Sequence, residues 1–310
     1  MEKYILQTRG LCKKYTDEYV VKHLDINVPK GKIYGLLGKN GAGKTTTMKM
    51  IMNLVQPTSG EILIFNKSME QRRQEDYYRI GAMIEIPGFY SHLSAYENLE
   101  IIATLRGVHK PKAIESVLKQ MGLDNVGKKK VGTYSVGMKQ RLGMATALLH
   151  EPELLILDEP TNGLDPIGIR ETREMLRSLC EMQGVSIIIS SHILSEVEQL
   201  ADYIGIMDKG KLLKELSIEE MRQLNRNYLE LQVSDISKTL YILEHQLNIQ
   251  DYKVADEQII HLFSRIDESA LINRQLIEHG IEVYTISPNK ESLEDYFTKL
   301  TGGVNNVPYH

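Results

Sequence analysis

The sequence has few of the features that secreted and membrane-spanning proteins require. It contains only two cysteines, Cys12 and Cys180, with no CxxC pair and no metal-ligand spacing. Two isolated cysteines predict reduced thiols in the cytosol. No apolar run approaches the roughly 18 residues that would span a bilayer, and the N-terminal residues lack the apolar core of a signal peptide. We therefore expect a cytoplasmic protein without a spanning helix.

A strong net charge is also lacking. The 310 residues carry a formal charge of −4, and their 42% hydrophobic and 25% charged content is typical of a soluble globular protein. Residues 217–310 hold 8 Lys and Arg against 15 Asp and Glu, a charge of −7 that leaves +3 for residues 1–216. An acidic C-terminal part disfavours contact with a phosphate backbone, so we expect no nucleic-acid partner. The shift in charge coincides with the end of the glycine-rich motifs and predicts two domains, 1–216 and 217–310.

The first predicted domain alternates strand-like and helix-like segments. Strands are predicted at Lys32–Leu37, Glu61–Phe65, Leu154–Leu157 and Val185–Ser190, and a helix at Thr45–Leu54. The last two strands are apolar runs of the kind that parallel sheets bury on both faces. Strands that alternate with helices predict an α/β domain with a mostly parallel sheet.

A helical subdomain is predicted within this domain, at about residues 87–150. Ser94-Ala-Tyr-Glu97 has the pattern of a capping box, in which the serine and the glutamate satisfy free backbone amides at a helix start. Leu99, Ile102 and Leu105 follow at helical spacing, and Ser135 is predicted to begin a second helix.

The C-terminal part predicts a small α+β domain. We expect strands at Tyr228–Val233, Tyr252–Ala255, Gln258–Phe263 and Ile281–Ser287, and helices at Ile236–Gln246, Ala270–His279 and Glu291–Leu300. Pro288 is expected to end the last strand. This order of elements matches a ferredoxin-like unit followed by a helix. His245, His261 and His279 fall on separate elements, so we expect no catalytic group among them.

Gly38-x-x-x-x-Gly43-Lys44-Thr45 is a P-loop pattern between a predicted strand and a predicted helix. Glycines allow backbone N–H groups to surround phosphate oxygens, and the helix N-terminus adds partial positive charge. Lys44 would neutralise the β- and γ-phosphates, and the Thr45 hydroxyl would bind Mg²⁺. A chance glycine-rich turn is the alternative, which this position between strand and helix disfavours. The predicted nucleotide-binding residues are Gly38, Lys39, Asn40, Gly41, Ala42, Gly43, Lys44, Thr45 and Thr46.

Two adjacent carboxylates, Asp158 and Glu159, follow the apolar run Leu154–Leu157. They lie at the carboxyl end of a predicted strand, where α/β sheets bind their ligands. Consecutive strand residues point to opposite sides, so the two need not have the same role. We expect Asp158 to hold Mg²⁺, and Glu159 to orient or deprotonate the attacking water.

Taken together, these motifs resemble those of the ATP-binding cassette (ABC) ATPases, over roughly residues 3–216. Tyr134-Ser-Val-Gly-Met-Lys-Gln140 is similar to the signature stretch of that family, and Gly163-Leu-Asp165 to the loop that communicates across its dimer. Ser190-Ser-His192 resembles the switch histidine segment, and Tyr15 corresponds in position to the aromatic residue that stacks on adenine. The resemblance implies a P-loop ABC ATPase fold with ATP and Mg²⁺ as ligands.

The resemblance also implies a head-to-tail dimer in which Ser135 and Gly137 of one copy close on the nucleotide held by Lys44 of the other. Asp165 would lie at the dimer interface, and His192 would contact the γ-phosphate. The physical basis is that a serine-capped helix start is a second anion site, and one chain could hardly aim both helix starts at the same phosphate.

The sequence departs from the family pattern at a few positions. Val136 and Met138 replace residues that are more often Gly and Gln, while Ser135 and Gly137 are kept. Glu85 stands where the family usually has the glutamine that touches Mg²⁺ and links to the membrane partner. We expect it to be a metal ligand with a catalytic role. Glu85 with the following Ile-Pro-Gly-Phe-Tyr90, and Ser292–Phe297, resemble the ATPase subunits of bacitracin and lantibiotic exporters.

The implied function is therefore the ATPase subunit of an exporter of antimicrobial peptides. It would act as a homodimer at the inner face of the cell membrane, bound to a separately encoded transmembrane permease through residues near Glu85–Tyr96. Phe89, Tyr90 and Tyr96 would either make this contact or pack in the core. The alternatives are an exporter subunit for another substrate, a soluble ABC ATPase acting on ribosomes or DNA, and a catalytically silent regulator.

Overall fold

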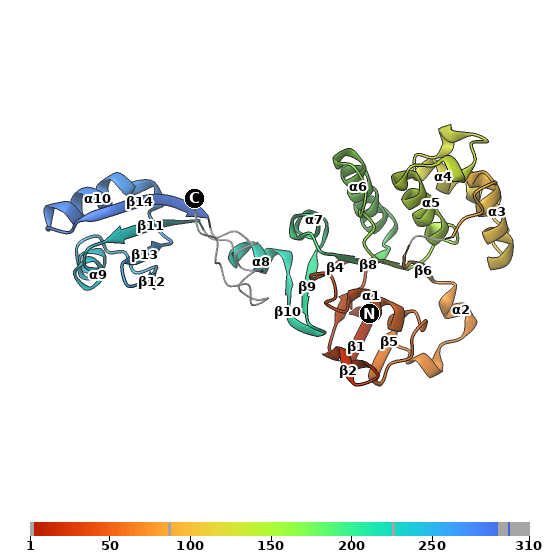
Figure 1. Cartoon of the computed structure of the whole chain (residues 1–310), viewed down its shortest axis with the longest axis horizontal. Helices are drawn as coiled ribbons and strands as arrows, with labels where there is room; N and C mark the ends of the chain where they lie inside the picture. Colours follow the sequence, from red (N-terminus) through yellow and green to blue (C-terminus); the bar gives the residue numbers. More distant parts are fainter. Residues whose placement is uncertain (1–2, 86–87, 225–226, 291–296, 298–310) are drawn as a thin grey trace. The chain divides into compact units, whose positions relative to one another are not determined.

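The computed structural model describes residues 3–85, 88–224, 227–290 and 297 (Figure 1). Backbone contacts divide the chain into two compact units, Met1–Ile218 and Glu219–His310, next to the position at which the charge changes sign. Each unit has its own cluster of buried hydrophobic residues. Among the described residues, no helix combines the length and the apolar character needed to cross a bilayer.

The central sheet of the first unit is the largest among the described strands, with the order β10-β9-β4-β8-β7-β6. Its strands are β4 (Ile33–Leu37), β6 (Ile80–Met83), β7 (Leu154–Leu157), β8 (Ser186–Ser191), β9 (Tyr203–Asp208) and β10 (Lys211–Ser217). All neighbouring pairs are parallel except β9 and β10. Every residue of β4, β7 and β8 is buried, as continuous apolar runs predict. The carboxyl ends of these three strands therefore meet at one edge.

A second, antiparallel sheet surrounds β1. Its strands are β1 (Tyr4–Tyr15), β2 (Glu18–Leu24), β3 (Asn27–Pro29) and β5 (Ser59–Ile64). Helix α1 (Lys44–Ile51) buries Met48, Met50 and Ile51 in the same hydrophobic cluster as residues of both sheets. The helix that begins at the phosphate loop is thus fixed by packing.

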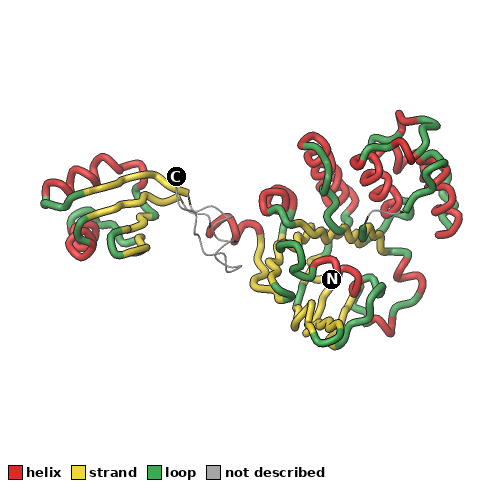
Figure 2. The backbone as a smooth tube through the Cα atoms, viewed as in Figure 1, coloured by secondary structure: helices red, strands yellow, loops and turns green. Residues whose placement is uncertain are grey.

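The helices of the first unit lie around the central sheet, and Figure 2 shows one group of them set apart from the strands. They are α1, α2 (Gln74–Tyr77), α3 (Ala95–Arg106), α4 (Ala113–Gln120), α5 (Val136–Leu148), α6 (Pro166–Gln183) and α7 (Leu194–Leu200). Helix α8 (Ile218–Leu224) follows β10 and begins at the last residue of this unit. The group α3–α5 is the predicted helical subdomain. The capping box is confirmed, because the Ser94 side chain accepts from the Glu97 amide and Glu97 accepts from the Ser94 amide. Ser135 caps α5, as predicted.

The second unit has a four-stranded antiparallel sheet with the order β12-β13-β11-β14. Its elements are β11 (Asn227–Val233), α9 (Ile236–His245), β12 (Tyr252–Asp256), β13 (Ile259–Leu262), α10 (Ser269–Glu278) and β14 (Val283–Lys290). This is the predicted ferredoxin-like arrangement. The three histidines lie on α9, on β13 and just after α10, on separate elements as expected.

The prediction that Pro288 ends the last strand is wrong. β14 continues through Pro288, which pairs with Leu229 of β11. The strand lies at the edge of the sheet, where a residue without an N–H group is tolerated because its outer side needs no partner. The expected helix Glu291–Leu300 and the motif Ser292–Phe297 fall outside the described residues, except for Phe297.

Candidate functional site

The phosphate loop follows β4 and forms the floor of an open cavity of about 360 Å³. Its lining includes Asn40 to Thr46 of the loop, together with Val20, Glu159, Asn162 and His192. Glycine is required at two positions of the loop, because a Cβ atom on Gly38 would lie 2.5 Å from the Met207 carbonyl oxygen, and one on Gly43 would lie 2.7 Å from that of Val20. Gly43 is also the N-cap of α1, without a side-chain cap. The first amides of α1 are therefore available to an anion.

Lys44 places its ammonium group among three oxygen acceptors. Its Nζ lies 2.6 Å from the Gly38 carbonyl oxygen, 3.4 Å from that of Lys39 and 3.2 Å from Oε1 of Glu159. The residue is 5% exposed, so this charge is largely shielded from bulk water. A buried cation beside the loop amides favours a negatively charged ligand in the cavity.

Asp158 joins the phosphate loop to β8. One carboxylate oxygen accepts from the Thr45 hydroxyl at 2.7 Å, and the other accepts from the Ser190 hydroxyl at 2.5 Å. Hydroxyl and carboxylate oxygens are ligands of the kind that Mg²⁺ prefers. In the described part of the chain, no three His, Cys, Asp or Glu side chains gather tightly enough to hold a metal alone. This donor set fits Mg²⁺, which takes one or two protein ligands and completes its shell with phosphate and water oxygens.

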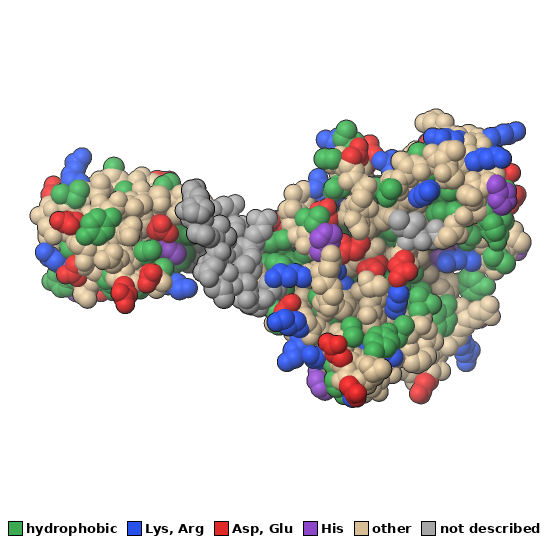
Figure 3. Space-filling model, viewed as in Figure 1, with side chains coloured by type: hydrophobic (Ala, Val, Ile, Leu, Met, Phe, Trp, Pro, Cys, Tyr) green, Lys and Arg blue, Asp and Glu red, His purple; other side chains and the backbone are tan. Residues whose placement is uncertain are grey.

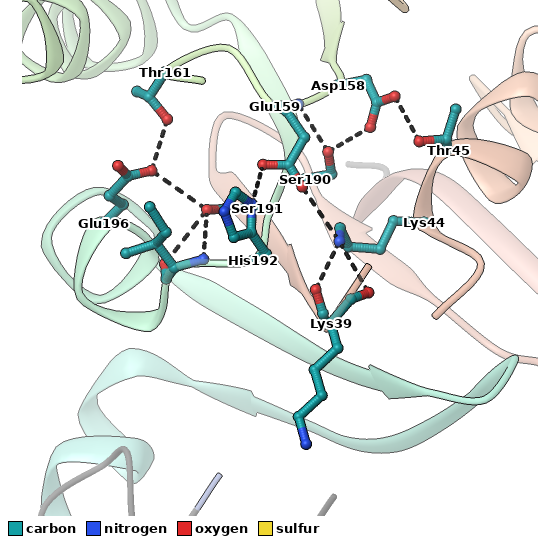
Figure 4. A network of polar contacts seen from close by, with 12 residues as sticks. Lys39, Lys44, Thr45, Asp158, Glu159, Thr161, Ser190, Ser191, His192 and Glu196 are labelled. Carbon is teal, nitrogen blue, oxygen red and sulfur yellow. Dashed lines mark hydrogen bonds and ion pairs between the residues drawn. The ribbon is translucent and has the colours of Figure 1, made fainter. Parts of the chain in front are cut away.

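Glu159 has a strained backbone held at both ends. Its φ is +48°, in the left-handed region that residues other than glycine seldom adopt. Its amide donates to the Ser190 hydroxyl at 2.8 Å, and its carbonyl accepts from Nε2 of Gln140 at 3.2 Å. Its carboxylate lies between Lys44 and His192, with Nδ1 of His192 2.8 Å from Oε2 (Figure 4). The two adjacent carboxylates thus face different partners, although both residues follow the end of β7 and strand alternation is therefore not the reason.

A hydrogen-bond network supports the loop that carries His192. Oε2 of Glu196, on α7, accepts from the Thr161 hydroxyl at 2.6 Å and from the Ser191 hydroxyl at 3.3 Å (Figure 4). The network connects the segment that follows β7 and the last residue of β8 to helix α7. Sequence reasoning missed Glu196, Thr161, Gln140 and the two contacts of Ser190. Gln140 and Ser190 lie within the signature stretch and the switch histidine segment, whereas no sequence pattern pointed to Glu196.

A second cavity, of about 410 Å³, brings Ser135, Gly137 and Asp165 together. The Ser135 hydroxyl accepts from the Met138 amide at 3.2 Å, and Asp165 caps α6 by accepting from the Gly168 amide at 2.8 Å. The linings of the two cavities share no residue. Within one chain, the signature residues and the phosphate loop therefore belong to separate sites.

Two further predicted site residues, Tyr15 and Glu85, do not line either cavity. Tyr15 is 45% exposed, and Nζ of Lys13 lies 4.8 Å from the centroid of its ring. Glu85 has a φ of +66° and forms an ion pair of 2.7 Å with Lys49 on α1. The hydrogen bond to Glu85 raises the pKa of Lys49. The structure thus joins Glu85 to the helix of the phosphate loop, rather than to the Thr45–Asp158 pair.

The sequence is similar to proteins of known family along almost its whole length. It is 50% identical over 299 residues to the bacitracin transport ATP-binding protein BcrA of Bacillus licheniformis, which covers 96% of this chain and 98% of that protein. It is 47% identical over 211 residues to the lantibiotic transport ATP-binding protein SrtF of Streptococcus pyogenes, covering 68% and 90% of the two chains.

Solved structures show the same fold. The ATP binding subunit of an ABC transporter superposes with a TM-score of 0.63 and 28% identity, over 71% of this chain and 92% of the other. CbiO1 of Clostridium perfringens, part of the ABC transporter complex cbiONQ, has a TM-score of 0.64 and 26% identity, over 80% and 97% of the two chains. Residues 21–162 match the family model described as ABC transporter. The chain therefore belongs to the ABC transporter family, as an ATP-binding subunit with the ABC ATPase fold.

Proposed function

We propose that this protein is the ATP-hydrolysing subunit of an exporter that removes antimicrobial peptides of the bacitracin or lantibiotic type. The observation that carries the proposal is that relatives named for bacitracin transport match both units of the chain, and not only the ATPase unit. The second unit is proposed to be an accessory domain of the same machine. The permease would be a separate membrane protein, and this subunit would sit against it on the inner face of the membrane.

ATP would be bound between two copies of the chain. The phosphate cavity of one copy would face the cavity of Ser135, Gly137 and Asp165 of the other, in a head-to-tail arrangement. The separation of these two cavities within one chain supports the arrangement, since each would be an anion site without its counterpart. A symmetric dimer of this kind closes two identical sites at once.

The loop amides and Lys44 would hold the β- and γ-phosphates. Thr45 and Asp158 would hold Mg²⁺, which when bound neutralises phosphate charge. Glu159 would accept a proton from, or orient, the attacking water, and His192 would keep its carboxylate aimed at the cavity while contacting the γ-phosphate. The ion pair of Glu159 with Lys44 and its contact with His192 support these roles. Tyr15 would stack on adenine from its exposed position.

Glu85 would strengthen metal binding and couple the site to transport. Its ion pair with Lys49 connects it directly to α1, the helix that follows the phosphate loop. Glu85 also lies at the start of the segment that leads to α3. Tyr90 and Tyr96 further along this segment are 56% and 39% exposed, which supports a contact surface rather than core packing. The permease would therefore dock near Glu85–Tyr96. If Glu85→Gln changes neither the Mg²⁺ dependence of hydrolysis nor peptide resistance, this role is wrong.

The central test is Glu159→Gln, which keeps the shape of the side chain but removes its negative charge. We expect ATP hydrolysis to fall by about 10²–10⁴-fold, the usual contribution of a general base. ATP binding should persist, and the ATP-bound dimer should accumulate, which light scattering measures. Glu181→Gln, at an exposed position on α6, is the matched control and should retain full activity. Undiminished hydrolysis in Glu159→Gln would overturn the general-base role, and a strict monomer with ATP would overturn the dimer.

The cargo is tested in cells. Expression together with the partner permease should raise resistance to bacitracin or a lantibiotic, and Glu159→Gln should abolish that gain. Capture of the tagged protein should recover a membrane protein. Recovery of ribosomes or DNA instead would favour the soluble alternative.

A further inference from the structure

The helical subdomain carries an excess of positive charge that the nucleotide site does not use. Residues 87–150 hold nine Lys and Arg against four Asp and Glu, or +5, in a chain whose total is −4. Figure 3 shows Lys and Arg side chains gathered over the part of the first unit that contains α3, α4 and α5. Three consecutive lysines, Lys128–Lys130, form an exposed loop between α4 and α5, which we call the lysine loop.

Within the described residues, no ion pair joins the side chains of the lysine loop to a carboxylate, and the charge of Lys130 interacts with that of Glu97 only at longer range. The contrast with other lysines is clear, since Lys110 pairs with Glu151 at 2.6 Å and Lys67 pairs with Asp76 at 2.7 Å. Nζ of Lys129 lies 5.9 Å from the Tyr134 ring centroid, a weak contact that leaves its charge uncompensated. Three adjacent exposed ammonium groups that form no ion pair with a carboxylate in the described residues attract an anionic surface.

The position of the lysine loop is fixed by its neighbour. The Val131 amide donates to the Leu93 carbonyl at 2.9 Å, and the Gly132 amide donates to that of Ser91 at 2.8 Å. Lys130 and Ser94 form an antiparallel bridge. The loop therefore lies directly beside the segment that carries the exposed Tyr90 and Tyr96. Tyrosine and lysine side chains together are typical of surfaces that meet the headgroup region of a membrane.

We propose that the lysine loop binds the anionic lipid headgroups that surround the permease. The proposal rests on the proposed function, because docking of the permease on the neighbouring Tyr90–Tyr96 segment would bring the loop within reach of the inner leaflet. Each lysine close to an anionic leaflet strengthens binding by about 5-fold, so three correspond to roughly 100-fold. The lipid headgroup is favoured over an acidic peptide because the charges form an exposed loop and not a pocket.

The test uses the full-length protein and vesicles of phosphatidylcholine, with and without about one third phosphatidylglycerol. We expect co-sedimentation with the anionic vesicles alone, in spite of the negative net charge of the chain, and loss of this binding at high salt. Replacing Lys128, Lys129 and Lys130 by glutamine should weaken binding by roughly 100-fold, whereas replacing them by arginine should preserve it.

The matched control replaces Lys209, Lys211 and Lys214 by glutamine. These lysines are exposed and lie in or beside the β9–β10 hairpin. Their replacement removes the same total charge as replacement of the lysine loop. Equal loss of binding in both triple variants would overturn the proposal, since the effect would then follow net charge. Absence of vesicle binding in the unaltered protein would also overturn the proposal. If, in addition, the lysine-loop variant fails to capture the permease, the partner of the loop is an acidic segment of the permease.

The assay contains neither nucleotide nor permease, so its failure is distinct from failure of the proposed function. If the unaltered protein hydrolyses ATP and dimerises but does not bind anionic vesicles, the lysine-loop proposal alone is rejected. Lipid binding by a protein whose Glu159→Gln variant hydrolyses ATP normally would reject the catalytic proposal alone.

Discussion

Substitution of Gly205 by alanine should destabilise the first unit, and Tyr34→Phe should partly relieve the damage. Tyr34 on β4 is completely buried, and its hydroxyl donates to Oε1 of Glu215 on β10 at 2.8 Å. Burial, followed by the charge of Glu215, raises the pKa of this hydroxyl, so it stays a proton donor. A Cβ atom on Gly205 of β9 would lie 2.2 Å from the Tyr34 oxygen and 3.0 Å from its Cζ.

The magnitudes follow from these contacts. Gly205→Ala forces an overlap inside a filled core and displaces the hydroxyl, at a cost of about 3 kcal/mol. Tyr34→Phe loses a hydrogen bond to a carboxylate, about 2 kcal/mol, while Glu215 keeps its two bonds from Asn27. The double variant contains no clashing oxygen, so it should cost about 3 kcal/mol instead of about 5 kcal/mol, a favourable coupling of about 2 kcal/mol.

Hydrogen exchange of peptides from β4 and β9 is the appropriate assay, because a chain of two units does not unfold in one transition. Gly88→Ala serves as the control, since a Cβ atom there meets nothing within 4 Å, and it should leave exchange unchanged. If the two effects simply add in the double variant, the clash does not involve the Tyr34 oxygen and the reasoning is refuted.

Three further predictions concern the rest of the first unit. Ser94→Ala removes one half of the capping box and should cost about 1 kcal/mol, measured as faster exchange in α3; unchanged exchange there would contradict it. Burial, followed by the charge of Arg106, lowers the pKa of His150. The unfolded chain then takes up a proton that the folded protein resists, so stability should fall as the pH drops below about 6.5. His150→Gln should flatten this dependence, measured by hydrogen exchange of peptides from α5 and β6 after correction for the intrinsic effect of pH on exchange. An equally steep dependence in the variant would rule this out. Ser190→Ala removes the hydrogen bonds of this hydroxyl to the Asp158 carboxylate and to the Glu159 amide. It should lower ATPase activity by about 10-fold with the fold intact; full activity would show that the two hydrogen bonds are dispensable.

Local patterns were sufficient where a short stretch of chain determines its own structure. The capping box at Ser94 involves residues three apart, and Ser135 caps the following helix by accepting from the Met138 amide three residues later, so both could be predicted. The unbroken apolar run Leu154–Leu157 was short enough to predict a buried strand. Pro288 shows the limit of this reasoning, since whether a proline is tolerated in a strand depends on whether that strand lies at the edge of its sheet.

The sequence by itself determined that the chain has a phosphate loop, two carboxylates at the end of a buried strand, and a second unit with a ferredoxin-like order of elements. Each of these depends on residue type and on spacing along the chain. Only the tertiary structure decided which side chains meet. The pairing of Glu85 with Lys49, and the clamping of the Glu159 backbone by Ser190 and Gln140, join residues that are distant in sequence. Such contacts arise because strands and helices from different parts of the chain pack side by side, and no local pattern encodes that register.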